Sequence, residues 1–113
     1  MAQTTVLSLG GSIVAPEKVD TEFIKSFLIC AERYLERSEE RRLIIVVGGG
    51  APAREYQRAY RQIVANPSDT DQDWIGVAAT RLNAELIRAV FASLCSDPVV
   101  TNPEAPVSFG GRV

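Results

Sequence analysis

Two glycine turns carry the residues best suited to chemistry, and each turn follows a run of strand-forming residues. Gly48-Gly49-Gly50 comes directly after five aliphatic residues at 43–47, and Gly10-Gly11-Ser12 comes after the β-prone run 4–9. A glycine turn that opens a helix presents backbone N–H groups and the positive end of the helix dipole, and the missing Cβ lets phosphate oxygens approach. The turns therefore predict anion sites. The triglycine is the stronger of the two, because Pro52 suits the first position of a following helix.

Arg54 lies close enough to the triglycine to take part in such a site. A guanidinium there could bind phosphate oxygens through two parallel hydrogen bonds. The alternative is a solvated helix face, because Arg58 and Arg61 continue at helical spacing, and for those two we expect solvation. Neither glycine turn matches GxxxxGK[ST] or GxGxxG, so the standard nucleotide-binding loops are excluded.

Composition excludes several other classes of chemistry. The 113 residues include no histidine, which rules out Ser-His-Asp and Cys-His triads and histidine metal ligands in this chain. Catalysis would then depend on positioning and charge stabilisation. The net charge of −2 argues against nucleic-acid binding through bulk positive charge. Cys30 and Cys95 lie in apolar helical patterns without a CxxC spacing, so we expect both to be small core residues.

No segment predicts a leader or a membrane span. The N-terminus lacks a basic region before its short apolar run, and no apolar stretch approaches the roughly 20 residues that cross a bilayer. We therefore expect a cytoplasmic protein without a membrane partner.

The pattern of elements predicts one α/β domain over 1–113 with a mostly parallel sheet. Strands are expected at 4–9, 43–47 and Val99-Val100, and helices from Asp20 and Pro52, with the longest helix before Asp97. The run 43–47 does not alternate, which predicts helices on both of its faces. Both glycine turns should then lie at the carboxyl edge of the sheet, where α/β proteins bind ligands.

Polar residues of the longest helix have two interpretations. Thr70 and Asp73 fit a capping box, whereas the functional alternative makes Asp73 an acceptor for a sugar hydroxyl. Thr80, Arg81 and Asn83 interrupt an apolar stripe, and the default is a face turned to solvent or to another subunit. Trp74 is expected to be a packing anchor.

Taken in order, these motifs resemble those of archaeal-type uridylate kinases, which are members of the amino-acid kinase superfamily. The resemblance rests on Leu9-Gly10-Gly11-Ser12, Val46-Val47-Gly48-Gly49-Gly50, Ala53-Arg54-Glu55-Tyr56, Ile75-Gly76 and Thr80-Arg81-Leu82-Asn83-Ala84. It implies a three-layer, carbamate-kinase-like sandwich and transfer of the ATP γ-phosphoryl group to UMP, giving UDP. It also implies Mg²⁺ and assembly into hexamers through the long helices.

The resemblance also implies which residues bind the two nucleotides. Those expected at ATP are Gly10, Gly11, Ser12, Gly50 and Arg54, and those expected at UMP are Gly49 and Asp73. It assigns no catalytic residue and no metal ligand to this chain. Isopentenyl phosphate kinases resemble the same sheet but depend on a histidine, which counts against them here.

Family members are about twice as long as this chain, so the resemblance implies the N-terminal part of a domain that is inactive alone. Gly110-Gly111 either belongs to a second phosphate loop or precedes a strand that Arg112-Val113 opens, and we favour the strand. The acceptor, UMP or another small phosphate or carboxylate, stays open. A non-catalytic nucleotide- or oxyanion-binding module of the same fold is the alternative function.

Overall fold

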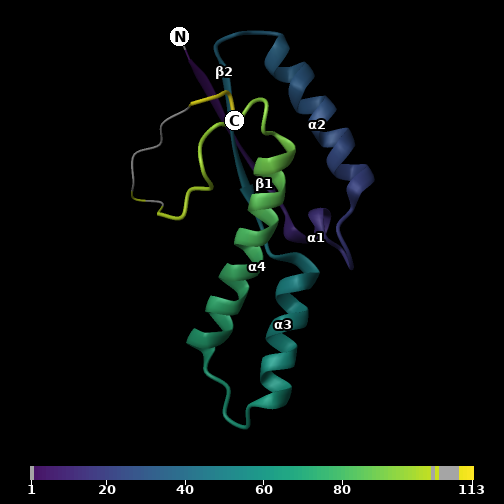
Figure 1. Cartoon of the computed structure of the whole chain (residues 1–113), viewed down its shortest axis with the longest axis vertical. Coiled ribbons are helices and arrows are strands. Elements are labelled where there is room, and N and C mark those ends of the chain that lie inside the picture. The colour runs from purple at the N-terminus through teal and green to yellow at the C-terminus, as the bar shows by residue number, and fades with distance from the viewer. Residues whose placement is uncertain (1, 103, 105–109) are drawn as a thin grey trace.

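The computed structural model describes residues 2–102, 104 and 110–113 as an elongated α/β unit (Figure 1). Its elements, in chain order, are β1 (Gln3–Leu9), α1 (Gly11–Val14), α2 (Thr21–Glu36), β2 (Arg41–Val47), α3 (Gly50–Ile63) and α4 (Asp69–Val90). The α/β class and the parallel sheet predicted from the sequence are confirmed: β1 and β2 pair in parallel, with Leu9 opposite Val47.

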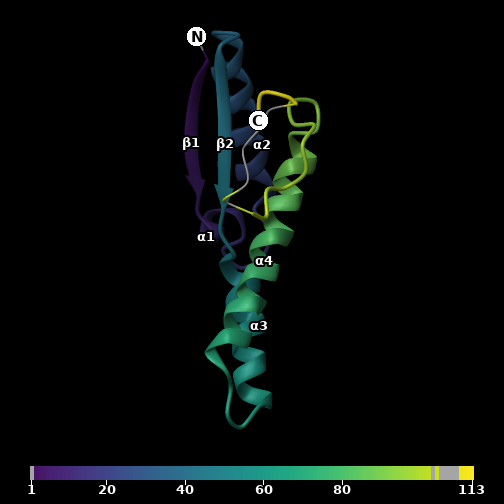
Figure 2. The same ribbon diagram turned by 90° about the vertical axis from the view of Figure 1, so that its left-hand side faces the viewer.

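The helices α2 and α4 cover one face of this sheet (Figure 2). Successive strand residues point to opposite faces, so Leu9, Leu43 and Val47 are buried beneath the helices. On the other face the side chains of Val6 and Val46 are 62% and 52% exposed. The expectation that both faces of 43–47 are covered is therefore wrong, because the described residues supply only two of the three predicted layers.

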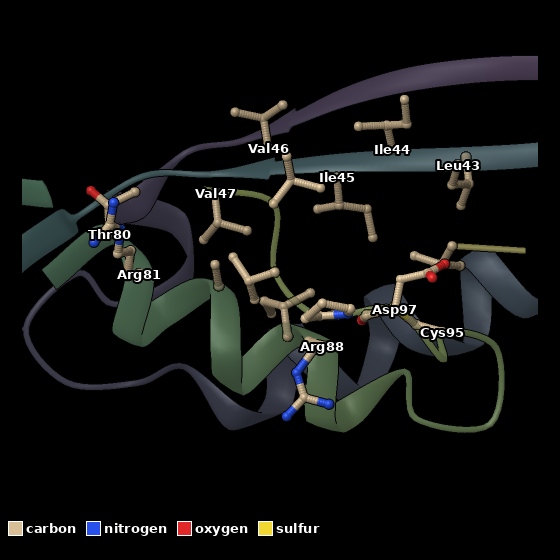
Figure 3. Close-up of a pocket in the computed structure, with 16 residues that line it drawn as sticks. Leu43, Ile44, Ile45, Val46, Val47, Thr80, Arg81, Arg88, Cys95 and Asp97 are labelled. Atoms are coloured by element: carbon tan, nitrogen blue, oxygen red, sulfur yellow. The ribbon is translucent and has the colours of Figure 1, made fainter. Parts of the chain in front are cut away.

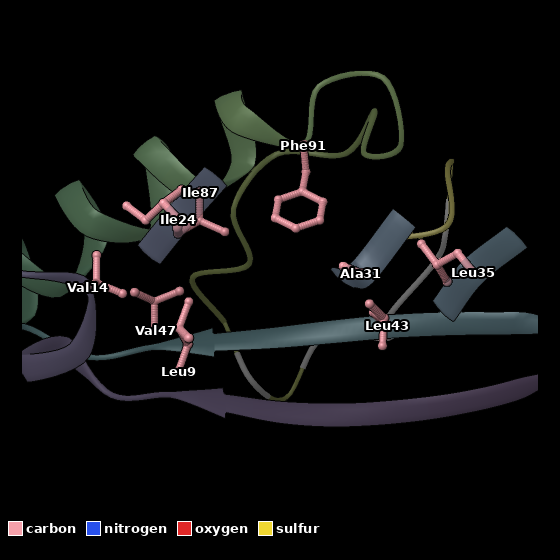
Figure 4. Packing of buried hydrophobic residues seen from close by; sticks show 9 residues of the cluster. All are labelled: Leu9, Val14, Ile24, Ala31, Leu35, Leu43, Val47, Ile87 and Phe91. Atoms are coloured by element: carbon pink, nitrogen blue, oxygen red, sulfur yellow. The ribbon is translucent and has the colours of Figure 1, made fainter. Parts of the chain in front are cut away.

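The core lies between the sheet and the two covering helices (Figure 4). Its fully buried centre is Phe91, whose ring meets the edge of Phe27 at a centroid distance of 5.8 Å. Its other members are Leu9, Val14, Ile24, Ala31, Leu35, Leu43, Val47 and Ile87. Burying one such side chain contributes about 1.5–3 kcal/mol to the stability of the fold. The cluster includes Leu9 and Val47, the last residues of the two strands. It therefore holds in place the points at which the glycine turns begin.

The helix starts show where local sequence decides and where it does not. Asp20 caps α2 as predicted, its carboxylate accepting from the Phe23 N–H at 3.0 Å. For α4 the capping box is wrong: the cap is Ser68, whose hydroxyl accepts from the Asp71 N–H at 3.2 Å, and Thr70 and Asp73 lie inside the helix. Pro52 is the third residue of α3 rather than the first, because the helix already begins at Gly50.

The free edge of β2 is met by the end of the chain. Val99-Val100 is not a strand, since the segment runs beside β2 without pairing. Instead the Leu43 N–H donates to the Arg112 carbonyl at 2.9 Å. The Arg112 guanidinium donates to the carbonyls of Leu35, Ser38 and Arg41, which ties this edge to the turn between α2 and β2.

The hairpin of α3 and α4 projects beyond the end of the sheet (Figures 1 and 2). Polar contacts hold its helices together, including Gln57 Nε2 to the Gln72 carbonyl at 2.9 Å. Trp74 is 62% exposed on this hairpin, so its predicted role as a packing anchor is wrong. Cys95 is half-buried, but Cys30 is exposed on α2, which contradicts its expected place in the core. Among the described helices, none has the length and apolar character of a membrane span.

Candidate functional site

The two glycine turns meet backbone to backbone at the carboxyl end of the sheet. The Gly48 N–H donates to the Leu9 carbonyl at 3.2 Å, which extends the strand pairing into the turns. A Cβ added to Gly11 would lie 2.6 Å from the Gly49 nitrogen and closer still to that of Gly50. The crossing leaves no room for a side chain, so two segments far apart in the sequence form one surface.

Gly50 adopts a conformation that favours glycine, with φ of 62°. A Cβ there would also overlap the Gly11 carbonyl oxygen. The next residue is fixed by a further bond between the turns, in which the Ala51 N–H donates to the Ala15 carbonyl at 3.0 Å. The triglycine thus lets the chain leave β2, pass Gly11 and enter α3 without a gap.

Backbone donors remain available where the turns meet. Among the residues that the structure describes, the N–H groups of Ser12, Gly49 and Gly50 donate to no protein oxygen. The amides of Gly49 and Gly50 open α3, whose 14 residues place the positive end of a helix dipole at the same point. Unpaired amides and a helix N-terminus suit an anion with several oxygens, such as a phosphate group.

Arg54 brings a full positive charge to these donors. Its Nη1 donates to Ser12 Oγ at 3.2 Å, so two residues predicted to bind ATP meet across the turns. Within the described part of the chain Arg54 has no ion-pair partner, whereas Arg58 pairs with Glu55 at 3.2 Å. Arg61 donates to Gln72 on the surface. Of these three, Arg54 is the one whose guanidinium contacts a glycine turn, and its partner there is a neutral hydroxyl.

A residue that the sequence interpretation placed in solvent supports the triglycine from behind. Asn83 is 3% exposed, and its Nδ2 donates to the carbonyls of Gly48 at 2.9 Å and Gly49 at 3.0 Å. The default reading of this polar stretch as a solvated or subunit-facing stripe is wrong for Asn83. The spacing of Gly76, Thr80, Asn83 and Ile87 defines one helix face, and that spacing was the available signal.

Asp73, the predicted ribose acceptor, is exposed on α4 and makes no hydrogen bond or ion pair among the described residues. The structure does not bring it into contact with the glycine turns, so its role stays a prediction. The described residues also contain no group of three or more Cys, Asp or Glu side chains that could hold a metal ion. The donors at the turns are N–H groups and a guanidinium, which fit phosphate rather than a cation.

An apolar groove runs along the free edge of β2, between this strand, α4 and the segment 95–100 (Figure 3). Its volume is about 470 Å³, and Thr80 and Arg81 of α4 lie at the end near Val47. The rest of its lining is mainly aliphatic side chains of β2, helix α4 and the segment 95–100. An apolar lining does not suit a phosphate, so the groove is distinct from the anion site that adjoins it.

Known proteins of one family match this chain. Residues 3–106 match the sequence profile of the amino acid kinase family. The uridylate kinase of Thermoplasma acidophilum is 42% identical over 84 residues, which are 74% of this chain and 34% of that protein. The uridylate kinase of Archaeoglobus fulgidus is 40% identical over 100 residues, or 88% and 42% of the two chains.

A solved structure gives the same result. The crystal structure of uridylate kinase from Archaeoglobus fulgidus superposes with a TM-score of 0.61 at 40% identity, covering 77% of this chain and 36% of that one. The chain thus spans between about a third and two-fifths of the length of these relatives.

Proposed function

The chain belongs to the amino acid kinase family, and on that premise we propose that it forms the phosphate-binding part of a kinase that transfers the ATP γ-phosphoryl group to UMP. The relatives named above are uridylate kinases, which supports UMP as the acceptor. The observation that carries the proposal is the meeting of the two glycine turns. Within the described residues, amides without a protein acceptor lie there beside an arginine that has no ion-pair partner.

In this proposal the first turn binds ATP, and the triglycine contacts both ATP and UMP. Gly10, Gly11 and Ser12 approach the ATP phosphates, joined by the Gly50 amide and the Arg54 guanidinium. The Gly49 amide donates to the UMP phosphate, and Asp73 accepts from the UMP ribose. Two adjacent amides on one turn would thus face donor and acceptor, which would bring the reacting groups together.

The chemistry needs little more from these residues than position and charge. Phosphoryl transfer passes through a loose transition state whose charge is spread over the equatorial oxygens, so amides and a guanidinium stabilise it without a histidine. Mg²⁺, when bound, neutralises charge on the phosphates. The described residues offer no carboxylate cluster for it, so in this proposal the metal arrives with the nucleotide.

For the 113-residue chain alone we propose nucleotide binding without turnover. Its span of 34% to 42% of the length of its uridylate kinase relatives supports this, because the remaining length of those proteins has no counterpart here. Binding without catalysis is also what the alternative function, a non-catalytic nucleotide module, requires. The experiment therefore has to separate the two.

A chimera makes that separation. Residues 1–100 replace the matching N-terminal part of Archaeoglobus fulgidus uridylate kinase, and UDP formation is followed with UMP, ATP and Mg²⁺. The 113-residue chain is assayed in parallel. We expect UDP from the chimera and none from the chain alone. A folded chimera that binds ATP but makes no UDP would contradict the kinase and favour the binding module.

A further inference from the structure

We propose that Asn83 is a positioning residue that orients the amides of the triglycine toward the phosphate site. The proposal rests on the function proposed above, because it concerns the same amides. Asn83 does not reach the outer side of the turns itself, since its side chain is buried between α4 and the triglycine.

The geometry follows from two planar peptide units. In a trans peptide the C=O and the following N–H point in opposite directions, and the described residues contain no cis peptide. Asn83 Nδ2 holds the Gly48 and Gly49 carbonyls toward α4 at 2.9 and 3.0 Å. The N–H groups in those same peptide units belong to Gly49 and Gly50. Both must therefore point away from α4. Gly11 lies against the same two nitrogens, and the phosphate site is proposed where the turns meet there.

Three consecutive glycines make such a restraint necessary. Glycine has the widest choice of backbone conformations, so a triglycine turn can rotate its peptide planes at little steric cost. Thr80 and Ala53 crowd Gly49, where a Cβ would lie 3.2 Å from Thr80 Oγ1 and 2.7 Å from Ala53 Cβ. Crowding limits where the turn lies, whereas only a hydrogen bond sets which way its amides face.

Asparagine is the side chain that fits this task. Its NH₂ group carries two hydrogens, one for each carbonyl, and two carbonyl acceptors identify the nitrogen. Aspartate has the same shape but, when ionised, only accepts, so it would repel both carbonyls. Leucine would suit a buried helix face yet would take from both carbonyls the side-chain donor that faces them. The contact with the triglycine thus explains why a polar residue, Asn83, lies on the same buried helix face as Ile87.

The test compares Asn83→Asp and Asn83→Ala with Ile87→Val. Ile87 is buried on α4 one turn further on, and its side chain has no group that could hydrogen-bond to the triglycine. Its variant therefore lowers stability without removing a bond to the turn. Inorganic pyrophosphate is the probe, and its affinity is measured together with the ¹H–¹⁵N spectrum of the free protein. We expect both Asn83 variants to bind pyrophosphate roughly tenfold more weakly, with the Gly49 and Gly50 amide signals displaced. The Ile87→Val variant should keep the pyrophosphate affinity and the Gly49 and Gly50 amide signals of the unmodified chain.

Two results would overturn the proposal. One is an Asn83→Asp variant whose Gly49 and Gly50 signals and pyrophosphate affinity match those of the unmodified chain. The other needs no variant and so holds even if the substitutions prevent folding: Asn83 side-chain amide protons that exchange with solvent as fast as those of an exposed asparagine. Should the unmodified chain bind neither pyrophosphate nor ATP, the proposed function fails, while the amide signals still decide the role of Asn83.

Discussion

Arg54 Nη1 lies 3.2 Å from Ser12 Oγ, which connects the first part of α3 to the first glycine turn across 42 positions of the sequence. The bond joins an exposed cation to a neutral hydroxyl. An anion at the turns can replace that hydroxyl, because a charge-assisted bond is about twice as strong as a neutral one. The contact thus holds Arg54 over the turns and leaves its charge available.

Replacing Arg54 with alanine should weaken ATP binding by about 1.5–3 kcal/mol, the range for a hydrogen bond to a charged group. The free energy of unfolding should change little, since the side chain is exposed. Calorimetric titration with ATP measures the effect. Arg58→Ala is the control, because Arg58 lies one turn further on α3 and pairs with Glu55. An equal loss of ATP affinity in both variants would mean that Arg54 belongs to a solvated helix face and does not bind phosphate.

Replacing Gly11 with alanine should destabilise the protein by about 1–3 kcal/mol or more, because the added Cβ meets the backbone of the triglycine. Urea unfolding measures this loss. Gly10→Ala is a matched control, since a Cβ there would meet only Ile13 at 3.7 Å, an ordinary contact. If the two variants unfold at the same urea concentration, the turns do not pack as the structure has them.

Replacing Arg112 with alanine should lower the free energy of unfolding by about 1–3 kcal/mol. The guanidinium donates to the carbonyls of Leu35, Ser38 and Arg41, and each of these carbonyls would lose its charged donor. Thermal unfolding is the measurement. For comparison, Arg88→Ala removes an exposed pair with Glu85 worth about 0.2–1 kcal/mol. A smaller loss for Arg112 than for Arg88 would show that the edge of β2 does not depend on it.

We also predict self-association through the α3–α4 hairpin. Tyr56, Ile63, Trp74 and Leu82 are each more than 60% exposed there, and we expect them to form the apolar patch of an interface. Leu82→Ser should shift the chain toward monomer in sedimentation velocity. Val46→Ser tests the open face of the sheet instead. A chain that is monomeric at every concentration, or that responds only to Val46→Ser, would contradict the hairpin as interface.

The two strands, the three long helices and the common edge of the glycine turns were predictable because they depend on local signals. A β-prone run that ends in glycine marks the carboxyl end of a strand. In a parallel sheet these ends lie at the same edge, so the turns that follow them lie close together. The cap at Asp20 followed in the same way from a side chain and an amide three residues apart.

The faces of α4 were not predictable, because apolar residues surround much of this helix and tertiary contacts select among them. Leu82, an apolar residue of this helix, is 67% exposed, whereas its polar neighbour Asn83 is buried. Asn83 is buried because its side chain donates to the carbonyls of Gly48 and Gly49, which lie 35 and 34 positions away in the sequence. No local sequence pattern contains such a contact. Val99-Val100 failed as a strand for a similar reason, since the edge it was expected to join is met by Arg112.

The central claim is that the two glycine turns form one phosphate-binding surface. Titrating the ¹⁵N-labelled chain with ATP while recording its amide spectrum tests that claim most directly. We predict the largest shifts at Ser12 and Gly50, one from each turn, saturating together as one site fills. Shifts confined to the groove beside β2, or separate saturation of Ser12 and Gly50, would contradict the claim.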